Sequence, residues 1–199
     1  MATVVLVGTL DTKGVEYDYL RSRLRERGVD VVLIDAGVLG EPLAEPDVGR
    51  EEVARAAGAE VADLVASGDR GAAVETMARG AAEVVKRLRA EGRLDGILAL
   101  GGSGGSAIAT YAMRQLPVGV PKHMVSTVAS GDTRPYVGAV DVTMMYSVVD
   151  IAGINQVSER ILTNAAAAIA GMADAQSIEI AETGRPLVGA TMFASRHRA

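Results

Sequence analysis

Short apolar runs that alternate with helix-patterned segments constrain the fold of this chain more than any other feature. Residues 3–8 form a continuous apolar run that ends in glycine, which is typical of a strand buried on both faces. Residues 71–91 instead repeat apolar side chains at helical spacing. The two patterns predict strands over 3–8, 29–35, 95–100, 122–128, 139–145 and 187–192, and helices over 15–27, 50–66, 71–91, 106–115 and 154–172.

This alternation predicts an α/β fold, with an open, mostly parallel sheet and helices on both faces in a Rossmann-like three-layer arrangement. The sequence contains no internal repeat and no low-complexity linker. We therefore expect a single domain over 1–193, followed by a short tail over 194–199.

The charge balance argues against a nucleic acid as the partner, because 20 Lys and Arg face 25 Asp and Glu, a net charge of −5. The chain begins directly with a strand-like segment rather than a signal peptide, and no apolar run is long enough for a membrane helix. We expect a cytoplasmic protein without a membrane partner. The absence of cysteine excludes disulfides, zinc–thiolate sites and a cysteine nucleophile.

Ligands of open parallel sheets bind beyond the carboxyl ends of the strands, which directs attention to residues 9–14, 35–37, 101–106 and 126–136. The glycine-rich segment is the strongest of these, because four glycines exceed what a turn requires and a helix N-terminus attracts phosphate. Its candidate phosphate-binding residues are Gly101, Gly102, Ser103, Gly104, Gly105 and Ser106. The alternative is a tight turn with a serine N-cap, and the acidic residue of the dinucleotide-binding pattern is absent.

Two further segments carry polar side chains at the same edge. Lys13 is a candidate counter-charge for a phosphate, and Thr9, Asp11 and Thr12 either hold Mg²⁺ or cap the helix. No Walker A pattern occurs in the chain.

In the segment after the fourth predicted strand, Arg134 is suited to grip a phosphate and Asp132 to hold a metal or a sugar hydroxyl. The alternative there is a turn with a surface ion pair. Asp141 and Asp150 are interpreted as members of structural ion pairs, and His123 as a satisfied core histidine. A Ser-His-Asp hydrolase is disfavoured, because no G-x-S-x-G pattern accompanies His123.

Four motifs occur in a recognisable order: Val-Gly-Thr-Leu-Asp-Thr-Lys-Gly at 7–14, Gly-Gly-Ser-Gly-Gly at 101–105, Val-Ser-Thr-Val-Ala-Ser-Gly-Asp-Thr-Arg-Pro-Tyr-Val-Gly at 125–138 and Met-Met-Tyr-Ser-Val-Val-Asp-Ile-Ala-Gly-Ile-Asn at 144–155. With these motifs the chain resembles the Tm-one-like ATP-binding domain family, which is named for a tomato tobamovirus-resistance protein and has bacterial members. The resemblance extends to about residue 193.

The resemblance implies a domain that binds ATP with Mg²⁺, the metal being held at Asp11 or Asp132. Nucleotide contacts would fall on 9–13, 101–106 and 126–133, which adds Thr127, Ser130, Gly131 and Thr133 to the candidates. In longer relatives a second α/β domain follows. The expected partners are a nucleotide and further copies of this chain in a homo-oligomer, and a separate chain that carries the second domain is an additional candidate.

Three functions remain open at this point. The leading hypothesis is a nucleotide-binding module that holds ATP across the strand ends. An ATP-dependent phosphotransferase or ATPase is the second, with Arg134 as the transition-state cation. The third is a non-catalytic scaffold that dimerises through the small residues of the helix at 154–172.

Overall fold

The computed structural model describes residues 1–177 and contains one five-stranded sheet in the order β2-β1-β3-β4-β5, with all neighbouring strands parallel. The strands are β1 (Thr3–Gly8), β2 (Asp30–Asp35), β3 (Gly96–Gly101), β4 (Lys122–Ser126) and β5 (Thr143–Tyr146). The predicted α/β class is confirmed. The predicted strand at 187–192, the domain boundary at 193 and the tail at 194–199 lie outside the described residues.

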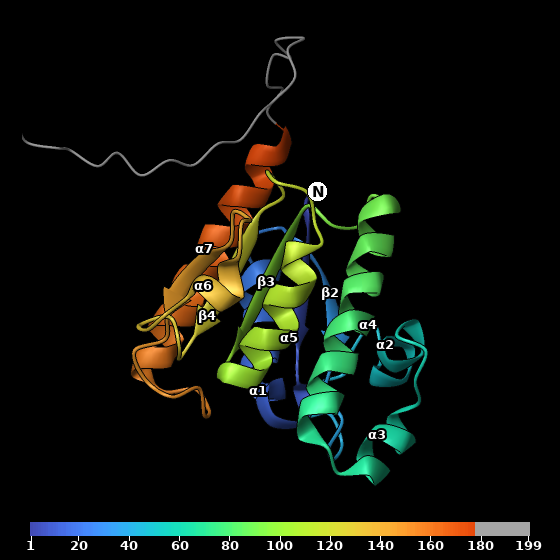
Figure 1. Ribbon diagram of the computed structural model, residues 1–199. Coiled ribbons are helices and arrows are strands. Elements are labelled where there is room, and N and C mark those ends of the chain that lie inside the picture. Colours follow the sequence, from blue (N-terminus) through green and yellow to red (C-terminus); the bar gives the residue numbers. More distant parts are fainter. Residues whose placement is uncertain (178–199) are drawn as a thin grey trace, which may run out of the picture.

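Helices cover both faces of the sheet. They are α1 (Leu10–Arg25), α2 (Arg50–Ala56), α3 (Val61–Ser67), α4 (Arg70–Ala90), α5 (Ser103–Arg114), α6 (Arg134–Val137) and α7 (Gln156–Asp174), and α7 ends in a 3₁₀ turn, Ala175–Ser177. Helices α4 and α5 lie together on one face, and α1 lies behind the sheet (Figure 1). Within the described residues, no helix is both long and apolar enough to cross a membrane.

The alternation of side chains along each strand divides the core into two clusters. Val5 and Val7 of β1 pack with α4 and α5, whereas Val4 and Leu6 pack with α1 and α7. Some small residues of α7 belong to the second cluster, in which Ala165 and Ala166 are fully buried. Ala167 and Gly171 of the same helix are exposed, so the dimer face of the scaffold hypothesis stays a prediction.

Two helices begin earlier than the sequence predicts. Helix α1 begins at Leu10 rather than at residue 15, because the carboxylate of Asp35 accepts a hydrogen bond from the Leu10 amide at 3.1 Å. Helix α5 begins at Ser103 rather than at residue 106, with the Ser106 amide donating to the Gly102 carbonyl at 2.8 Å. Most of the glycine-rich segment is therefore the first turn of α5 and not a loop before it.

The strand order reverses between β1 and β3, since the chain passes from β1 to β2 on one side and from β3 to β4 on the other. Pairing of these two strands ends at Leu6 and Leu98. Beyond that point the buried Tyr17 hydroxyl lies between the strands, bonded to the Val7 carbonyl and accepting from the Leu100 amide at 2.9 Å. This phenol holds β1 and β3 apart at the end of the sheet where they diverge.

Candidate functional site

A cavity of about 620 Å³ lies at this reversal, beyond the carboxyl ends of β1 and β3. Doubly wound sheets bind ligands at such a switch point, and the volume is in the range of small-molecule sites. One wall is polar and is formed by Thr9, Asp11, Thr12, Lys13, Gly101, Gly102, Ser103, Gly104 and Gly105. The opposite wall is mostly apolar and comes from α3, α4 and the segment after β2.

The first turn of α5 presents unused hydrogen-bond donors to the cavity. Its first intrahelical bond is donated by Ser106, so the amides of Ser103, Gly104 and Gly105 have no acceptor within the helix. The N-cap residue Gly102 supplies no side-chain bond to them. These amides and the positive end of the helix dipole favour an anion at this point.

Many glycines of this chain are required by the fold. A Cβ at Gly8 would lie 2.0 Å from the Tyr17 ring, and a Cβ at Gly80 would lie 1.9 Å from the Val53 carbonyl oxygen. Because real Cβ atoms do not approach other atoms so closely, packing alone explains glycine at these positions.

The glycines of the α5 turn are different. A Cβ at Gly104 would meet nothing nearer than the Arg70 guanidinium at 3.8 Å, and at Gly105 nothing nearer than a carbonyl oxygen at 3.5 Å. Gly102 would meet the Thr127 hydroxyl at 3.6 Å. None of these three has a positive φ, so neither packing nor backbone conformation requires glycine. Gly102 is the N-cap residue, a position that itself favours glycine, whereas at 104 and 105 close approach of a ligand to the backbone is a physical reason for it.

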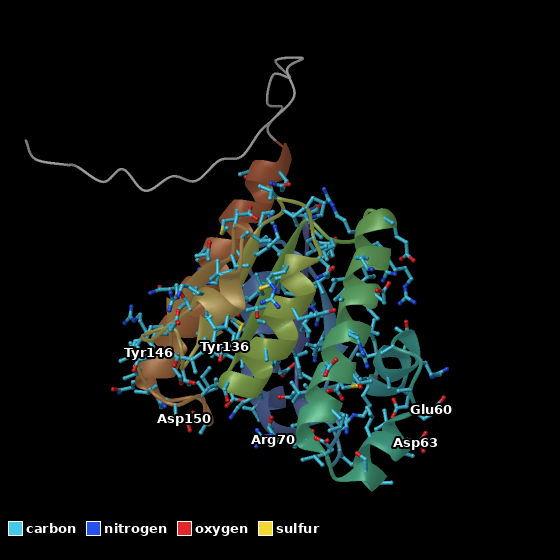
Figure 2. The ribbon with its side chains drawn as sticks, in the orientation of Figure 1. Glu60, Asp63, Arg70, Tyr136, Tyr146 and Asp150 are labelled. Carbon is cyan, nitrogen blue, oxygen red and sulfur yellow. The ribbon has the colours of Figure 1, made fainter. Side chains whose placement is uncertain are left out.

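Arg70, which sequence reasoning missed, lines the cavity beside Gly104. It is the first residue of α4, it is exposed, and it makes no hydrogen bond or ion pair within the described part of the chain. Figure 2 shows Arg70 at the same end of the molecule as Asp150, which also lines the cavity. No sequence signal connects Arg70 with the glycine-rich segment, because 33 residues separate Arg70 from Ser103 and only the fold brings them together.

The polar residues of α1 are partly engaged by neighbouring loops. The Lys13 ammonium donates to the Ile151 carbonyl. One carboxylate oxygen of Asp11 accepts from the Leu39 amide at 2.8 Å, whereas its Oδ1 is buried without a hydrogen-bond partner. The hydroxyls of Thr9 and Thr12 bond to each other at 2.9 Å.

The unpaired Oδ1 of Asp11 is the feature on which the fit of Mg²⁺ to this site is judged. Mg²⁺ is usually held by one or two carboxylates together with phosphate oxygens and water. Asp11, a single carboxylate in the cavity lining, fits that mode, whereas the described residues contain no cluster of three or more His, Cys, Asp or Glu suited to a metal. Asp132, the other predicted ligand, does not line the cavity.

The segment after β4 adjoins the cavity at Thr127, whose amide donates to the Gly101 carbonyl at 3.2 Å, but it does not form part of the lining. Neither Thr127 nor any of Ser130, Gly131, Asp132, Thr133 and Arg134 lines it. Arg134 is exposed and its guanidinium bonds the Asp132 carboxylate at 2.6 Å, which lowers the pKa of Asp132. The physical reason is topological, because β4 ends one strand beyond the switch point.

Ser106 also lies behind the cavity rather than in its lining. It is fully buried, and its hydroxyl bonds the Ser126 hydroxyl at 2.7 Å. Ser106 therefore fixes α5 to the end of β4, while Thr127 lies beside Gly102 without entering the lining.

A buried ion pair shapes the loop after β2. Asp35 accepts from the Arg50 guanidinium at 2.8 Å and from the Gly37 amide at 2.9 Å. Arg50 also donates to the carbonyls of Leu39 and Gly40, at 3.1 and 2.7 Å. The pair thus fixes the segment that carries Leu39 into the cavity wall.

Three other predicted roles can now be placed. Asp141 is in a structural pair as predicted, with the fully buried Lys122 at 2.8 Å. Asp150 is exposed and accepts from the adjacent Ile151 amide, so its predicted ion pair is wrong. His123 is a core residue but not a satisfied one, since neither ring nitrogen has a hydrogen-bond partner among residues 1–177. Burial lowers the pKa of His123.

Comparison with known proteins gives one family. The model of an uncharacterised protein family, the UPF0261 N-terminal domain, matches residues 2–178. A UPF0261 protein of Clostridium tetani is 51% identical over 190 residues, which are 96% of this chain and 47% of that protein. The ToMV susceptible protein tm-1(GCR26) of Solanum lycopersicum is 34% identical over 209 residues, covering 96% of this chain and 28% of that protein. The resemblance inferred from the motifs is confirmed.

The chain spans less than half the length of these relatives. Among solved structures, a Trichoderma reesei cutinase in complex with a phosphonate inhibitor matches with a TM-score of 0.41 and 15% identity, over 86% of this chain and 76% of that one. This likeness carries no argument about function.

Proposed function

The chain belongs to the UPF0261 family, and on that premise we propose that it is a nucleotide-binding domain that holds ATP in the cavity at the β1–β3 switch point. The observation that carries the proposal is the glycine content of the first turn of α5. Glycine costs helix stability, and the fold requires none at positions 104 and 105 within the helix. A phosphate that contacts the backbone of that turn would explain why glycine is present there.

The polar wall supplies what a triphosphate needs. The amides of Ser103, Gly104 and Gly105 donate to phosphate oxygens at the positive end of the helix dipole. Lys13 and Arg70, which both line the cavity, add positive charge from its two sides. Asp11 is the residue that would hold Mg²⁺, which neutralises phosphate charge when it is bound.

Binding without turnover is the proposed mode, in preference to a phosphotransferase or ATPase. The carboxylates in the cavity lining are Asp11, Asp69 and Asp150, and each accepts a backbone hydrogen bond that holds a loop or a helix end. The arginine assigned to the transition state, Arg134, pairs with Asp132 outside the cavity. Arg70 is free to contact phosphate, but the lining offers no histidine or glutamate to activate water.

Nucleotide binding is proposed as the share of this domain in the activity of its longer relatives. Because the chain spans less than half of those proteins, a second domain on the same or a separate chain is the proposed partner. A cytoplasmic location, where ATP and Mg²⁺ are both abundant, is part of the same proposal.

Calorimetric titration of ATP into the purified chain, with and without Mg²⁺, tests the proposal. The expected result is saturable binding that Mg²⁺ strengthens, and no release of free phosphate from the same mixture above a protein-free blank. Absence of binding under both conditions would overturn the nucleotide site. Mg²⁺-dependent phosphate release would replace the binding module by an ATPase.

A further inference from the structure

The apolar wall of the cavity has no role in the phosphate site. It contains Leu64 and Val65 of α3 together with Val74 and Met77 of α4. Leu39, on the segment after β2, faces the same space. Val65 and Leu39 are among the most exposed large apolar side chains of the chain, at 49% and 62%. Covering such surfaces with an apolar group is favourable, because it removes them from water.

Helix α3 carries part of this wall at the surface of the molecule. It has seven residues, and none of them is buried. Its acidic residues Glu60 and Asp63 lie on the outer side of the molecule, away from α5 (Figure 2). The helix ends at Gly68, which has a φ of +64° and turns the chain directly into α4. Leu64 and Val65 therefore face the cavity from a helix that is only partly buried, with Val61 and Leu64 packed against the edge of the core.

The position of Arg70 indicates how a ligand is oriented in the cavity. Arg70 lies beside Gly104, at the junction between the polar wall and the start of α4. A ligand whose phosphates bond the α5 turn and Arg70 meets Ala73, Val74 and Met77 on the next turns of α4. The other direction, toward β4, is not part of the cavity, since residues 127–134 do not line it.

We propose that the nucleoside part of the nucleotide packs against α3 and the start of α4, with Leu64 and Val65 as the residues that distinguish a nucleotide from a bare polyphosphate. This inference rests on the proposed function and adds a specificity determinant to it. A flat heterocycle covers the apolar wall, while the phosphates keep the contacts of the α5 turn. The wall gives affinity for the base, and Arg70 acts equally on every ligand that carries the phosphate chain.

The test compares ATP with inorganic tripolyphosphate on the whole chain. The wild-type protein is expected to bind ATP about tenfold or more tightly than tripolyphosphate, because the base covers apolar surface. In the double variant Leu64→Ser, Val65→Ser this advantage shrinks to about twofold or less, while the affinity for tripolyphosphate stays unchanged. Arg70→Ala weakens both ligands by a similar factor.

Ala66→Ser is the matched control, since Ala66 is exposed on the same helix and does not line the cavity. It should leave both affinities unchanged. Circular dichroism and urea unfolding check that the double variant folds; we expect a folded protein with some loss of stability, because Leu64 packs against the core but no residue of α3 is fully buried. If the double variant keeps the wild-type preference for ATP, the inference is wrong and the nucleotide site stands. If the wild-type protein binds neither ligand, the proposed function itself is wrong.

Discussion

Replacing Gly104 by alanine separates a ligand-binding role of the glycines from a structural one. In the protein without ligand, the new Cβ would lie 3.8 Å from the Arg70 guanidinium, which is an ordinary van der Waals contact. Gly104 lies within α5 and has no positive φ. Alanine is the better helix former by up to about 1 kcal/mol, so the free energy of unfolding should stay the same or rise.

The effect on ATP binding should have the opposite sign. The methyl group lies on the surface of the turn that the phosphate contacts, and it displaces the phosphate from the amides. A hydrogen bond to a charged group contributes about 1.5–3 kcal/mol, so the loss of one weakens ATP by about 10- to 150-fold. Calorimetric titration gives the dissociation constant, and urea unfolding gives the stability.

Gly171→Ala is the matched control, because Gly171 lies in α7 and a Cβ there would meet nothing within 4 Å. It should raise stability to a similar extent and leave the affinity for ATP unchanged. If the Gly104→Ala variant bound ATP as tightly as the wild-type protein, the reasoning would be refuted, because the glycine would then have no role in ligand binding.

Three further variants test the framework of the site by urea unfolding. Arg50→Met leaves the Asp35 carboxylate buried without its cation and should cost about 3 kcal/mol; a loss below 1 kcal/mol would mean that the pair does not hold the loop. Tyr17→Phe removes the hydrogen-bond acceptor of the buried Leu100 amide and should lower the free energy of unfolding by about 1–3 kcal/mol. Unchanged stability would show that the Tyr17 hydroxyl has no structural role. Because burial lowers the pKa of His123 from its usual 6.5, the unfolded chain takes up a proton below that pH that the folded chain does not. Stability should therefore fall as the pH drops below about 6.5, by at most about 1.4 kcal/mol per pH unit from this group, and His123→Leu should remove that part of the slope.

The fold was predictable because its strands are apolar on both faces and its helices are periodic. The starts of α1 and α5 were not, because their causes are distant in sequence. The Leu10 amide donates to Asp35, 25 residues away, and neither N-cap residue, Thr9 or Gly102, makes a side-chain capping bond. Rules based on local sequence recognise only capping residues next to the helix, whereas the carboxylate that caps α1 belongs to Asp35, at the end of the neighbouring strand β2.

Part of the candidate site was also predictable. The rule that ligands lie beyond the carboxyl ends of parallel strands places residues 9–13 and 101–105 together, and both segments line the cavity. The rule does not say which strand ends adjoin the reversal of strand order, and for that reason it also selected 127–134. Arg70 and the wall of α3 were missed, since exposed residues of a connecting helix carry no pattern in the sequence. That these groups bind a nucleotide stays a prediction for the titrations.

The polar residues at the start of α1 make structural contacts that their residue types alone do not predict. Within two turns, Asp11 bonds the loop after β2, and both Lys13 and Glu16 bond the segment after β5, at Ile151 and Gly153. The same helix supplies Tyr17, which lies between β1 and β3. A lysine with three donors can hold a loop carbonyl and still face a phosphate, so its structural bond does not compete with a binding role. Helix α1 thus fixes two of the loops around the cavity, those after β2 and β5, while α3, α4 and α5 complete its walls.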